Sequence, residues 1–371
     1  MKFVCLQENL IRGLSVVSKA VPIKAPLPIL SNMLIETQNG RLRLSATNLS
    51  TTIITHVGAS IEEEGAITIP AKLFHEFVSH LSPTTLSCEV KNDILHVVSE
   101  RVKARFNGLP SSEFPELPGK IKKNVLLKLA PKEFSEAVSI SSFATSSDES
   151  RLVLTGVLIG FKKGKLTLVG LDGFRLSEKS LPAKSEAAPF SVIIPSKALL
   201  EVARILGTAS EAISFSLDEE NNLAVFEADG SVIASGILTG EFPDYRKIIP
   251  PDHTVSAQFA SADLLEAVRL ANVFARDNNV ITLALDPKGF IKVSSSHEET
   301  GANDSKIDAT VEGEGITQSF NSRYLLDLLN NVKAQRFVLE SKGGLTPALI
   351  KPADTDDCIY VVAPVRSQNS A

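Results

Sequence analysis

The sequence predicts an α+β fold of three similar tandem domains, and two observations lead to that prediction. One segment recurs three times along the 371-residue chain, as ITIPAKLFHEFVSHL from Ile67, VIIPSKALLEVARIL from Val192 and QSFNSRYLLDLLNNV from Gln318. Each copy also combines two amphipathic helices with many short strands. That mixture is typical of antiparallel sheets with helices on one face.

The repeat keeps one register along the chain. Pro70, Pro195 and Asn321 occupy the aligned position, at spacings of 125 and 126 residues. The segments EFPEL and EFPDY recur at a similar spacing, as do GRLRL, GKLTL and GFIKV. We therefore expect three domains, with boundaries near residues 1–119, 120–251 and 252–371. Proline-containing stretches at 114–120 and 242–251 stand where linkers are expected.

A first amphipathic helix is expected at the start of each copy. Its apolar face comprises Leu10, Leu14 and Val17 in the first copy, and Leu264, Val268 and Ala271 in the third. Strands are predicted at residues 33–37, 41–46, 53–57 and 102–106 of the first copy, and at 223–227 and 231–238 of the second. Asn39-Gly40 and Lys163-Gly164 predict hairpin turns between strands.

The second helix of each copy carries one apolar stripe three times. Its members are Phe74, Phe77, Val78 and Leu81, then Leu199, Val202, Ala203 and Leu206, then Leu325, Leu328, Leu329 and Val332. Lys72, Lys197 and Arg323 lie two positions after the aligned residue, which is nearly opposite this stripe. Arg12 and Lys19 lie opposite the apolar face of the first helix. A solvated helix face explains any one of these cations, whereas three in register favour a basic surface.

Composition limits the class of protein. The net charge of −5 argues against a protein that binds nucleic acid by neutralising many phosphates. No stretch is long and apolar enough for a membrane span, and the N-terminus lacks the apolar region of a secretory signal. Cys5, Cys88 and Cys358 are far apart and lack CxxC spacing, so we expect free buried thiols in a reducing cytoplasm.

No enzymatic motif is present. The six histidines are scattered, and neither HExxH, GxSxG, a P-loop nor GxGxxG occurs in context. Asp172 has no partner acid or base in the sequence, so we expect it to act in a turn. His75 is expected at the surface, and the acidic residues 62–64 in a solvated turn. We predict no catalytic residue, no metal site and no cofactor.

Five segments together resemble one family. They are LPILSNMLIE from Leu27, RLVLTGVLIG from Arg151, LDGFRL from Leu171, FPDYRKIIP from Phe242 and YVVAPVR from Tyr360. From Met1 to Arg366 the chain resembles the bacterial sliding clamps, the beta subunits of DNA polymerase III. The resemblance implies a DNA clamp fold in which two chains pair head to tail into a ring. Antiparallel sheets would lie outside, and helices would line a central hole that duplex DNA occupies.

The resemblance implies a non-catalytic, cytoplasmic processivity factor for DNA polymerase. A closed ring holds DNA without tight phosphate binding, which fits the acidic net charge. The residues then expected to face DNA, independently of base sequence, are Arg12, Lys19, Lys24, Lys72, Lys197 and Arg323. Phe106 and Phe274 are expected at the interface of the homodimer.

The family binds a clamp loader, the replicative polymerase and other proteins through a pocket that accepts a short apolar peptide. Carried over to this sequence, the deep part comprises Leu154, Leu171, Gly173, Phe174, Arg175, Leu176, Pro243, Lys247, Ile248, Val361 and Val362. The outer part comprises Asn321, Tyr324, Thr346, Ala363, Pro364, Val365 and Arg366. Leu171, Phe174 and Ala363 depart from the family's frequent Thr, His and Met, so the preferred peptide is expected to differ. The tail 367–371 extends beyond the usual terminus.

One alternative is a three-repeat scaffold that binds peptides and not DNA. The cation at the same place in all three second helices disfavours it, because a pure scaffold has no need for that charge.

Overall fold

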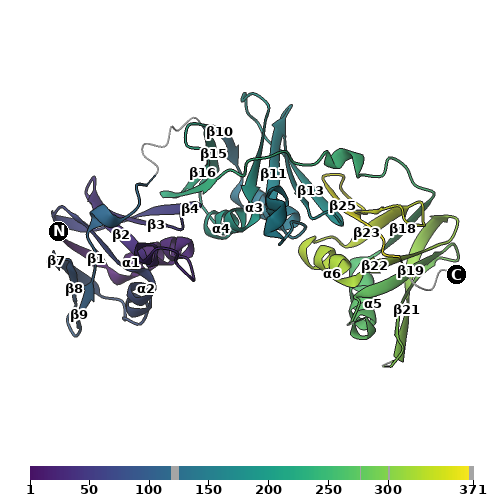
Figure 1. Ribbon diagram of the computed structural model, residues 1–371, viewed down its shortest axis with the longest axis horizontal. Coiled ribbons are helices and arrows are strands. Elements are labelled where there is room, and N and C mark those ends of the chain that lie inside the picture. The colour runs from purple at the N-terminus through teal and green to yellow at the C-terminus, as the bar shows by residue number, and fades with distance from the viewer. Residues whose placement is uncertain (118–124, 276, 300, 367–371) are drawn as a thin grey trace. The chain divides into compact units, whose positions relative to one another are not determined.

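The computed structural model describes residues 1–117, 125–275, 277–299 and 301–366 (Figure 1). Contacts within the chain divide it into two compact units. Unit 1 consists of Met1–Lys132, Lys184–Ala187 and Glu201–Ile237, and unit 2 of Glu133–Ala183, Ala188–Leu200 and the chain from Leu238 onward. The expected boundary at 119/120 lies outside the described residues, and the three domain limits stay a prediction.

Each repeat contributes two α-helices to the described chain, in agreement with the sequence pattern. They are α1 (Gln7–Val17), α2 (Ala71–Ser79), α3 (Pro131–Ser142), α4 (Ser196–Leu206), α5 (Ser261–Phe274) and α6 (Ser322–Asn331). Short 3-10 turns stand at Ser18–Ala20, Pro28–Ser31, Ser111–Glu113, Glu149–Thr155 and Tyr245–Lys247. Helix α1 ends at Val17, so Lys19 lies in the following 3-10 turn and not on the helix as predicted.

Unit 1 contains two antiparallel sheets, in the orders β5-β1-β7-β8-β9 and β10-β15-β16-β17-β4-β3-β2-β6. The strands of the first are β1 (Lys2–Leu6), β5 (Ser60–Glu63), β7 (Thr85–Lys91), β8 (Ile94–Val98) and β9 (Lys103–Asn107). Those of the second are β2 (Asn32–Gln38), β3 (Arg41–Thr47), β4 (Thr51–Val57), β6 (Ala66–Pro70), β10 (Val125–Leu129), β15 (Ile213–Asp218), β16 (Leu223–Ala228) and β17 (Ser231–Gly236). Pairing of β4 with β17 joins the first repeat to the second, and the hydroxyls of Thr55 and Ser231 lie 2.8 Å apart across it.

Unit 2 contains one antiparallel sheet, in the order β14-β11-β12-β13-β25-β24-β23-β18-β21-β20-β19-β22. Its strands from the second repeat are β11 (Gly156–Lys162), β12 (Lys165–Leu171), β13 (Arg175–Pro182) and β14 (Phe190–Pro195). Those from the third are β18 (Val255–Ala260), β19 (Val280–Asp286), β20 (Phe290–His297), β21 (Gly301–Gly313), β22 (Ile316–Asn321), β23 (Arg336–Ser341), β24 (Ala348–Pro352) and β25 (Cys358–Val362). Pairing of β13 with β25 joins the second repeat to the third.

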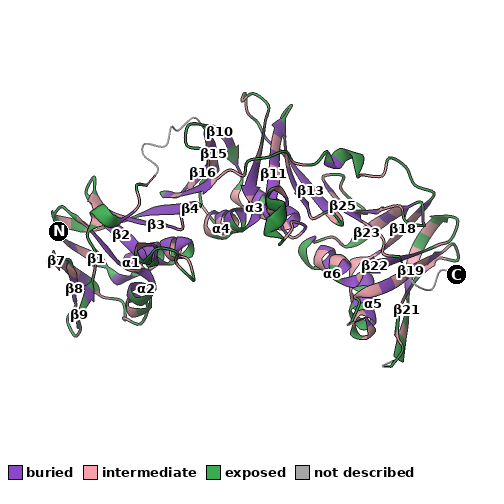
Figure 2. Ribbon diagram, viewed as in Figure 1, coloured by how far each residue is buried: buried purple, intermediate pink, exposed green. Residues whose placement is uncertain are grey.

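The apolar stripes read from the sequence form the cores. Leu10, Leu14 and Val17 of α1 are fully buried, and α1 packs on β3 and β4. Gly13 allows this close approach, because a Cβ at that position would lie 2.4 Å from a methyl of Val57. Colouring by burial in Figure 2 shows the helices buried along one side and exposed along the other. This is the pattern of helices that cover a sheet.

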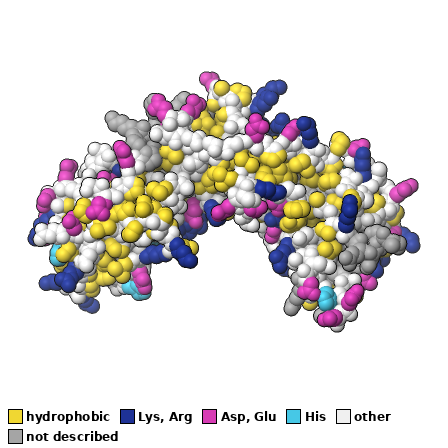
Figure 3. Space-filling view, in the orientation of Figure 1, with side chains coloured by type: hydrophobic (Ala, Val, Ile, Leu, Met, Phe, Trp, Pro, Cys, Tyr) yellow, Lys and Arg dark blue, Asp and Glu magenta, His cyan; other side chains and the backbone are white. Residues whose placement is uncertain are grey.

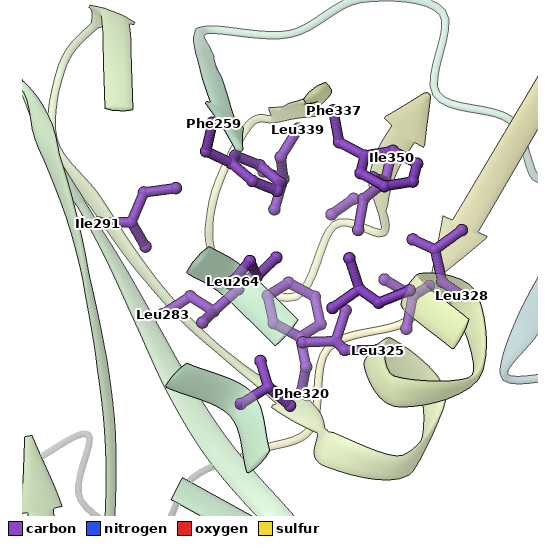
Figure 4. Close-up of a cluster of buried hydrophobic side chains, with 14 of the residues drawn as sticks. Phe259, Leu264, Leu283, Ile291, Phe320, Leu325, Leu328, Phe337, Leu339 and Ile350 are labelled. Carbon is purple, nitrogen blue, oxygen red and sulfur yellow. The ribbon is translucent and has the colours of Figure 1, made fainter. Parts of the chain in front are cut away.

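In unit 2 the helices α5 and α6 pack together and against the strands β20, β21 and β22. Figure 4 shows how Leu264 of α5 and Leu325 and Leu328 of α6 meet Phe320 and Phe337 from the sheet. All five side chains are at most 1% exposed. The stripe predicted for each second helix is therefore buried in the third repeat, as it is at Phe74 and Leu199 in the first two.

The predicted turns are confirmed. Asn39 and Gly40 have φ angles of 49° and 71°, and Lys163 and Gly164 have 52° and 74°. Two successive positive φ angles are the mark of the tight hairpin turn for which Asn-Gly is favoured. The prediction of free, buried cysteines is also confirmed. Among the described residues, none of the helices is long and apolar enough to span a membrane.

Candidate functional site

A small apolar cluster in unit 2 brings together residues that the sequence placed in the deep part of the site. It consists of Leu154, Val169, Leu171, Leu176, Tyr245, Leu349 and Val361, all buried. Phe242 and Ile249 pack against it from the segment that also carries the exposed residues Pro243, Lys247 and Ile248. Figure 3 shows hydrophobic side chains gathered at the surface over β11 and β13, the strands beside this cluster.

The turn after β12 holds an exposed aromatic ring next to this cluster. Asp172 Oδ1 accepts hydrogen bonds from the backbone N–H groups of Phe174 (2.8 Å) and Arg175 (2.9 Å). Gly173 has a φ of +96°, a conformation that side chains other than glycine rarely adopt. The guanidinium of Arg151 also donates to the carbonyl oxygen of Asp172. The turn role predicted for Asp172 is confirmed, and the turn leaves the side chain of Phe174 61% exposed.

The side chain of Arg175 donates three hydrogen bonds within the site. Its Nε donates to Asp172 Oδ2 (3.0 Å), its Nη1 to Asp327 Oδ2 (2.5 Å) and its Nη2 to the carbonyl oxygen of Phe143 (2.8 Å). The guanidinium also lies over the ring of Tyr324, 4.5 Å from the centroid. Only 10% of the side chain is exposed. The network joins β13, the residue after α3 and helix α6.

The residues of the predicted outer part are also brought to this region. The N–H of Ala363 donates to the carbonyl oxygen of Phe174 (2.8 Å), and that of Val365 to Ser319 (2.7 Å). The Tyr360 hydroxyl donates to the carbonyl oxygen of Tyr324 (3.0 Å), and burial raises the pKa of that hydroxyl. Asn321 caps α6 by accepting from the Arg323 N–H, and the side-chain amide of Gln318 donates to the carbonyl oxygen of Thr346. Pro364 is half-buried and Arg366 is exposed.

Val362 differs from its neighbours in the predicted set. Successive residues of a strand point to opposite faces of the sheet. Val361 joins the small cluster of the site, so Val362 points into the main core of unit 2 and is 0% exposed. Val362 therefore lies on the face of the sheet opposite the cluster of the site.

The six residues expected to face DNA are all exposed in the structure: Arg12, Lys19, Lys24, Lys72, Lys197 and Arg323. Lys72, Lys197 and Arg323 stand in the first turns of α2, α4 and α6. Their apolar neighbours Phe74, Leu199 and Leu325 are fully buried, so the cation and the core stripe lie on different sides of each helix, as predicted.

The two expected interface residues differ in exposure. Phe106 of β9 is only 5% exposed and packs edge-on against Phe74 and Phe77 of α2. Phe274, at the end of α5, is half-buried. The nearby α5 residues Leu270 and Val273 are 47% and 51% exposed, and the sequence pattern did not single them out. The sequence could have indicated them, because both are apolar residues that fall outside the apolar stripe of α5.

The described residues contain no group of three or more His, Cys, Asp or Glu side chains that could hold a metal ion. His75 is half-buried and its Nε2 lies 3.1 Å from the Ser15 hydroxyl, with its pKa lowered by burial and by the charge of Lys19. It is thus less exposed than expected for a surface histidine. Phe143 and Asp327 belong to the site but no motif in the sequence indicated them.

Comparisons with known proteins agree with this fold. Sequence models of the N-terminal, central and C-terminal domains of the DNA polymerase III beta subunit match residues 1–118, 128–244 and 246–366. The beta sliding clamp of Synechococcus elongatus is 31% identical, with 99% of each chain covered. The sliding clamp structure from Bacillus subtilis superposes with a TM-score of 0.95 at 26% identity, over 99% of each chain. The beta subunit structure from Pseudomonas aeruginosa gives 0.94 at 26% identity, over 99% of this chain and 100% of that one.

The fold is that of a three-domain DNA clamp, α+β with antiparallel sheets. The chain belongs to the bacterial beta sliding clamps, the family of DNA polymerase III beta subunits. It is accordingly a processivity subunit of the polymerase and not an enzyme. Membership of the family implies DNA and a DNA polymerase as its partners.

Proposed function

We propose that two copies of the chain close head to tail into a ring around duplex DNA, with helices lining the hole. The ring tethers the replicative polymerase and other proteins to DNA in the cytoplasm, after a clamp loader has opened and closed it. A net charge of −5 is compatible with this role, because closure retains DNA where phosphate contacts alone are too weak.

The cation at one position of α2, α4 and α6 is the observation that carries the proposal. Lys72, Lys197 and Arg323 are exposed on three repeats of an acidic chain. A few exposed cationic side chains attract the DNA polyanion without fixing it in one position, which suits a protein that slides along DNA. Arg12, Lys19 and Lys24 add exposed positive charge to the first repeat.

Two sheet edges support ring closure between copies. In unit 1, β9 is the last strand of its sheet and pairs only with β8 among the described strands. In unit 2, β21 pairs with β20 over residues 301–308, whereas its pairing with β18 covers only residues 309–313. An unpaired edge is a template for a strand of another chain. Exposed Lys103 and Arg105 on β9 are opposite in charge to exposed Asp308 on β21, whereas Asp304 already pairs with Lys292 at 3.1 Å.

The apolar cluster with the turn of Phe174 supports the peptide-binding part of the proposal. Leu171 and Leu176 form a buried apolar floor, and the exposed side chains of Phe174 and Ile248 stand beside it. Apolar surface with a few polar groups at its rim is what a short apolar peptide segment requires. The partners are then proteins that carry such a segment, the clamp loader and polymerase among them.

Retention on DNA tests the ring. The protein, loaded by a clamp loader onto nicked circular DNA, is expected to stay bound in moderately high salt and to leave when the circle is cut. Equal retention on linear and circular DNA contradicts a topological link. A chain that binds peptide but is never retained on a circle is instead the peptide-binding scaffold.

A further inference from the structure

We propose that Arg175 is a positioning residue: it locks the turn of Phe174 and the helix of Tyr324 into one geometry and thereby couples the two halves of the peptide site. This inference rests on the proposed peptide-binding function and deepens it. The deep half is the turn 172–175 with its apolar floor. The outer half is Tyr324 with the segment 363–366.

The contacts of Arg175 within the protein leave little of its side chain free to bind a peptide. Each of its three side-chain nitrogens already donates, to Asp172, to Asp327 and to the carbonyl oxygen of Phe143. One face of the guanidinium lies against the ring of Tyr324. With 10% of its side chain exposed, Arg175 is committed to the protein.

These bonds hold parts that are far apart in the sequence. Asp172 fixes the turn twice, because Oδ1 caps the backbone of the turn while Oδ2 receives Arg175. Asp327 and Tyr324 are both on α6, so one guanidinium holds that helix by an ion pair and by stacking. A planar guanidinium can pair with a carboxylate and lie against an aromatic ring at the same time. The ammonium of lysine is a point charge without this planar arrangement of donors.

Two further hydrogen bonds to backbone carbonyl oxygens connect the same parts of the site. The carbonyl oxygen of Phe174 accepts from Ala363, and the carbonyl oxygen of Tyr324 accepts from the hydroxyl of Tyr360. The turn, α6 and the chain after β25 thus form one hydrogen-bonded frame with Arg175 at its centre. A peptide that occupies one half meets the other half already in place, which spares part of the ordering cost of binding.

A matched ion pair lies elsewhere on the same strand. Lys179 Nζ is 2.9 Å from Asp357 Oδ1, with side chains 11% and 45% exposed. Arg175 and Asp327 are 10% and 44% exposed. Both pairs tie β13 to the third repeat, but the Lys179 pair lies away from the turn. It therefore reports what the loss of an ion pair does to stability alone.

The test measures binding of two peptides by calorimetry: a long one with a Gln and a Leu-Phe end, and a short one with the Leu-Phe end only. Arg175→Lys and Asp327→Asn are each expected to weaken the long peptide about tenfold, roughly 1.4 kcal/mol. Both variants are expected to change the short peptide less than about twofold, which is under roughly 0.4 kcal/mol. The double variant is expected to be no worse than either single one, because both break the same tie.

The controls separate the possible failures. Asp357→Asn is expected to lower the unfolding temperature while leaving both peptide affinities unchanged. If Arg175→Lys weakens both peptides and Asp327→Asn weakens neither, Arg175 binds the peptide directly and the positioning role is overturned. If Asp357→Asn weakens the long peptide as much as Asp327→Asn does, general loosening explains the effect and the inference fails. If the unaltered protein binds neither peptide, the proposed peptide site itself is wrong.

Discussion

The ring of Phe106 packs edge-on against the ring of Phe74, with centroids 5.0 Å apart and planes at 76°. A second edge-on contact joins Phe106 to Phe77 at 5.2 Å. Arginine at position 106 would remove both contacts and place an unpaired cation in a site that is 5% exposed. We expect Phe106→Arg to destabilise the protein by at least about 3 kcal/mol. Urea unfolding measures this loss, and an unchanged midpoint contradicts the packing role.

Phe106→Arg is for the same reason a poor test of the dimer interface. The exposed side of α5 offers a cleaner one, because Val273 is 51% exposed and Phe274 half-buried. Val273→Glu and Phe274→Arg are expected to give folded monomers of 39.8 kDa, whereas the unaltered chain is expected to form a dimer of twice that mass. Sedimentation at micromolar concentration decides this. Leu200→Glu, at a site 44% exposed on α4, is the control and is expected to remain a dimer.

Local patterns in the sequence predicted what depends on local geometry. The spacing of Leu10, Leu14 and Val17 specifies a helix face whatever it packs against, and that face is buried as predicted. Asn39-Gly40 specifies its hairpin in the same way. Exposure of Lys72 followed from its position opposite the stripe that contains Phe74.

The local sequence patterns could not predict contacts between residues that are far apart in the chain. Arg175 and Asp327 are 152 residues apart in the sequence, and no periodicity relates them. The resemblance placed Arg175 in the site but did not predict the hydrogen bonds that the Arg175 side chain makes there. It also placed Val361 and Val362 there together, although the alternation along β25 sends them to opposite faces. The resemblance placed Phe106 at an interface, which stays a prediction, but it gave no sign of the packing of Phe106 on α2.

Charge reversal tests the exposed cations of the second helices. Lys72→Glu, Lys197→Glu and Arg323→Glu combined are expected to leave the unfolding temperature nearly unchanged, because surface substitutions usually shift stability by less than about 0.5 kcal/mol each. Loading onto nicked circles, or retention there, is expected to fall severalfold.

A control with the same change in charge is available on the β11–β12 hairpin. Lys162, Lys163 and Lys165 are all exposed beside its turn. Their combined reversal to glutamate is expected to leave loading intact. An equal loss in both triple variants would mean that net charge alone, and not the position on the helices, controls loading.

Removal of the C-terminal segment tests the outer half of the peptide site. A chain that ends at Tyr360 would lose Val361 and Val362, which are 1% and 0% exposed and pair with β13 and β24. A chain that ends at Val362 keeps these strand residues and loses only the segment from Ala363. We expect it to remain a folded dimer. Its affinity for a Gln- and Leu-Phe-containing peptide is expected to fall from the micromolar range, about 8 kcal/mol, by tenfold or more. Normal peptide binding by this variant would show that the outer half is misplaced.

Thiol reactivity tests the burial of Cys358 and its dependence on pH. Burial raises the pKa of this thiol to about 12, and its side chain is 2% exposed. An exposed cysteine in the unfolded chain has a pKa near 8.5. The folded protein therefore holds this proton where the unfolded chain has lost it. Its contribution to stability is complete below about pH 8.5 and declines as the pH rises towards 12.

Two measurements test the burial of Cys358 and this decline of stability with rising pH. Alkylation by iodoacetamide at pH 8, read at each cysteine by mass spectrometry, is expected to leave Cys358 unmodified until urea unfolds the chain, because the thiolate is the reactive form. Cys358→Ala removes the titrating group, so its unfolding free energy is expected to fall less steeply than that of the unaltered protein between pH 8.5 and 10. Rapid alkylation of Cys358 in the folded protein, or parallel pH profiles for the two proteins, would contradict the buried, protonated thiol.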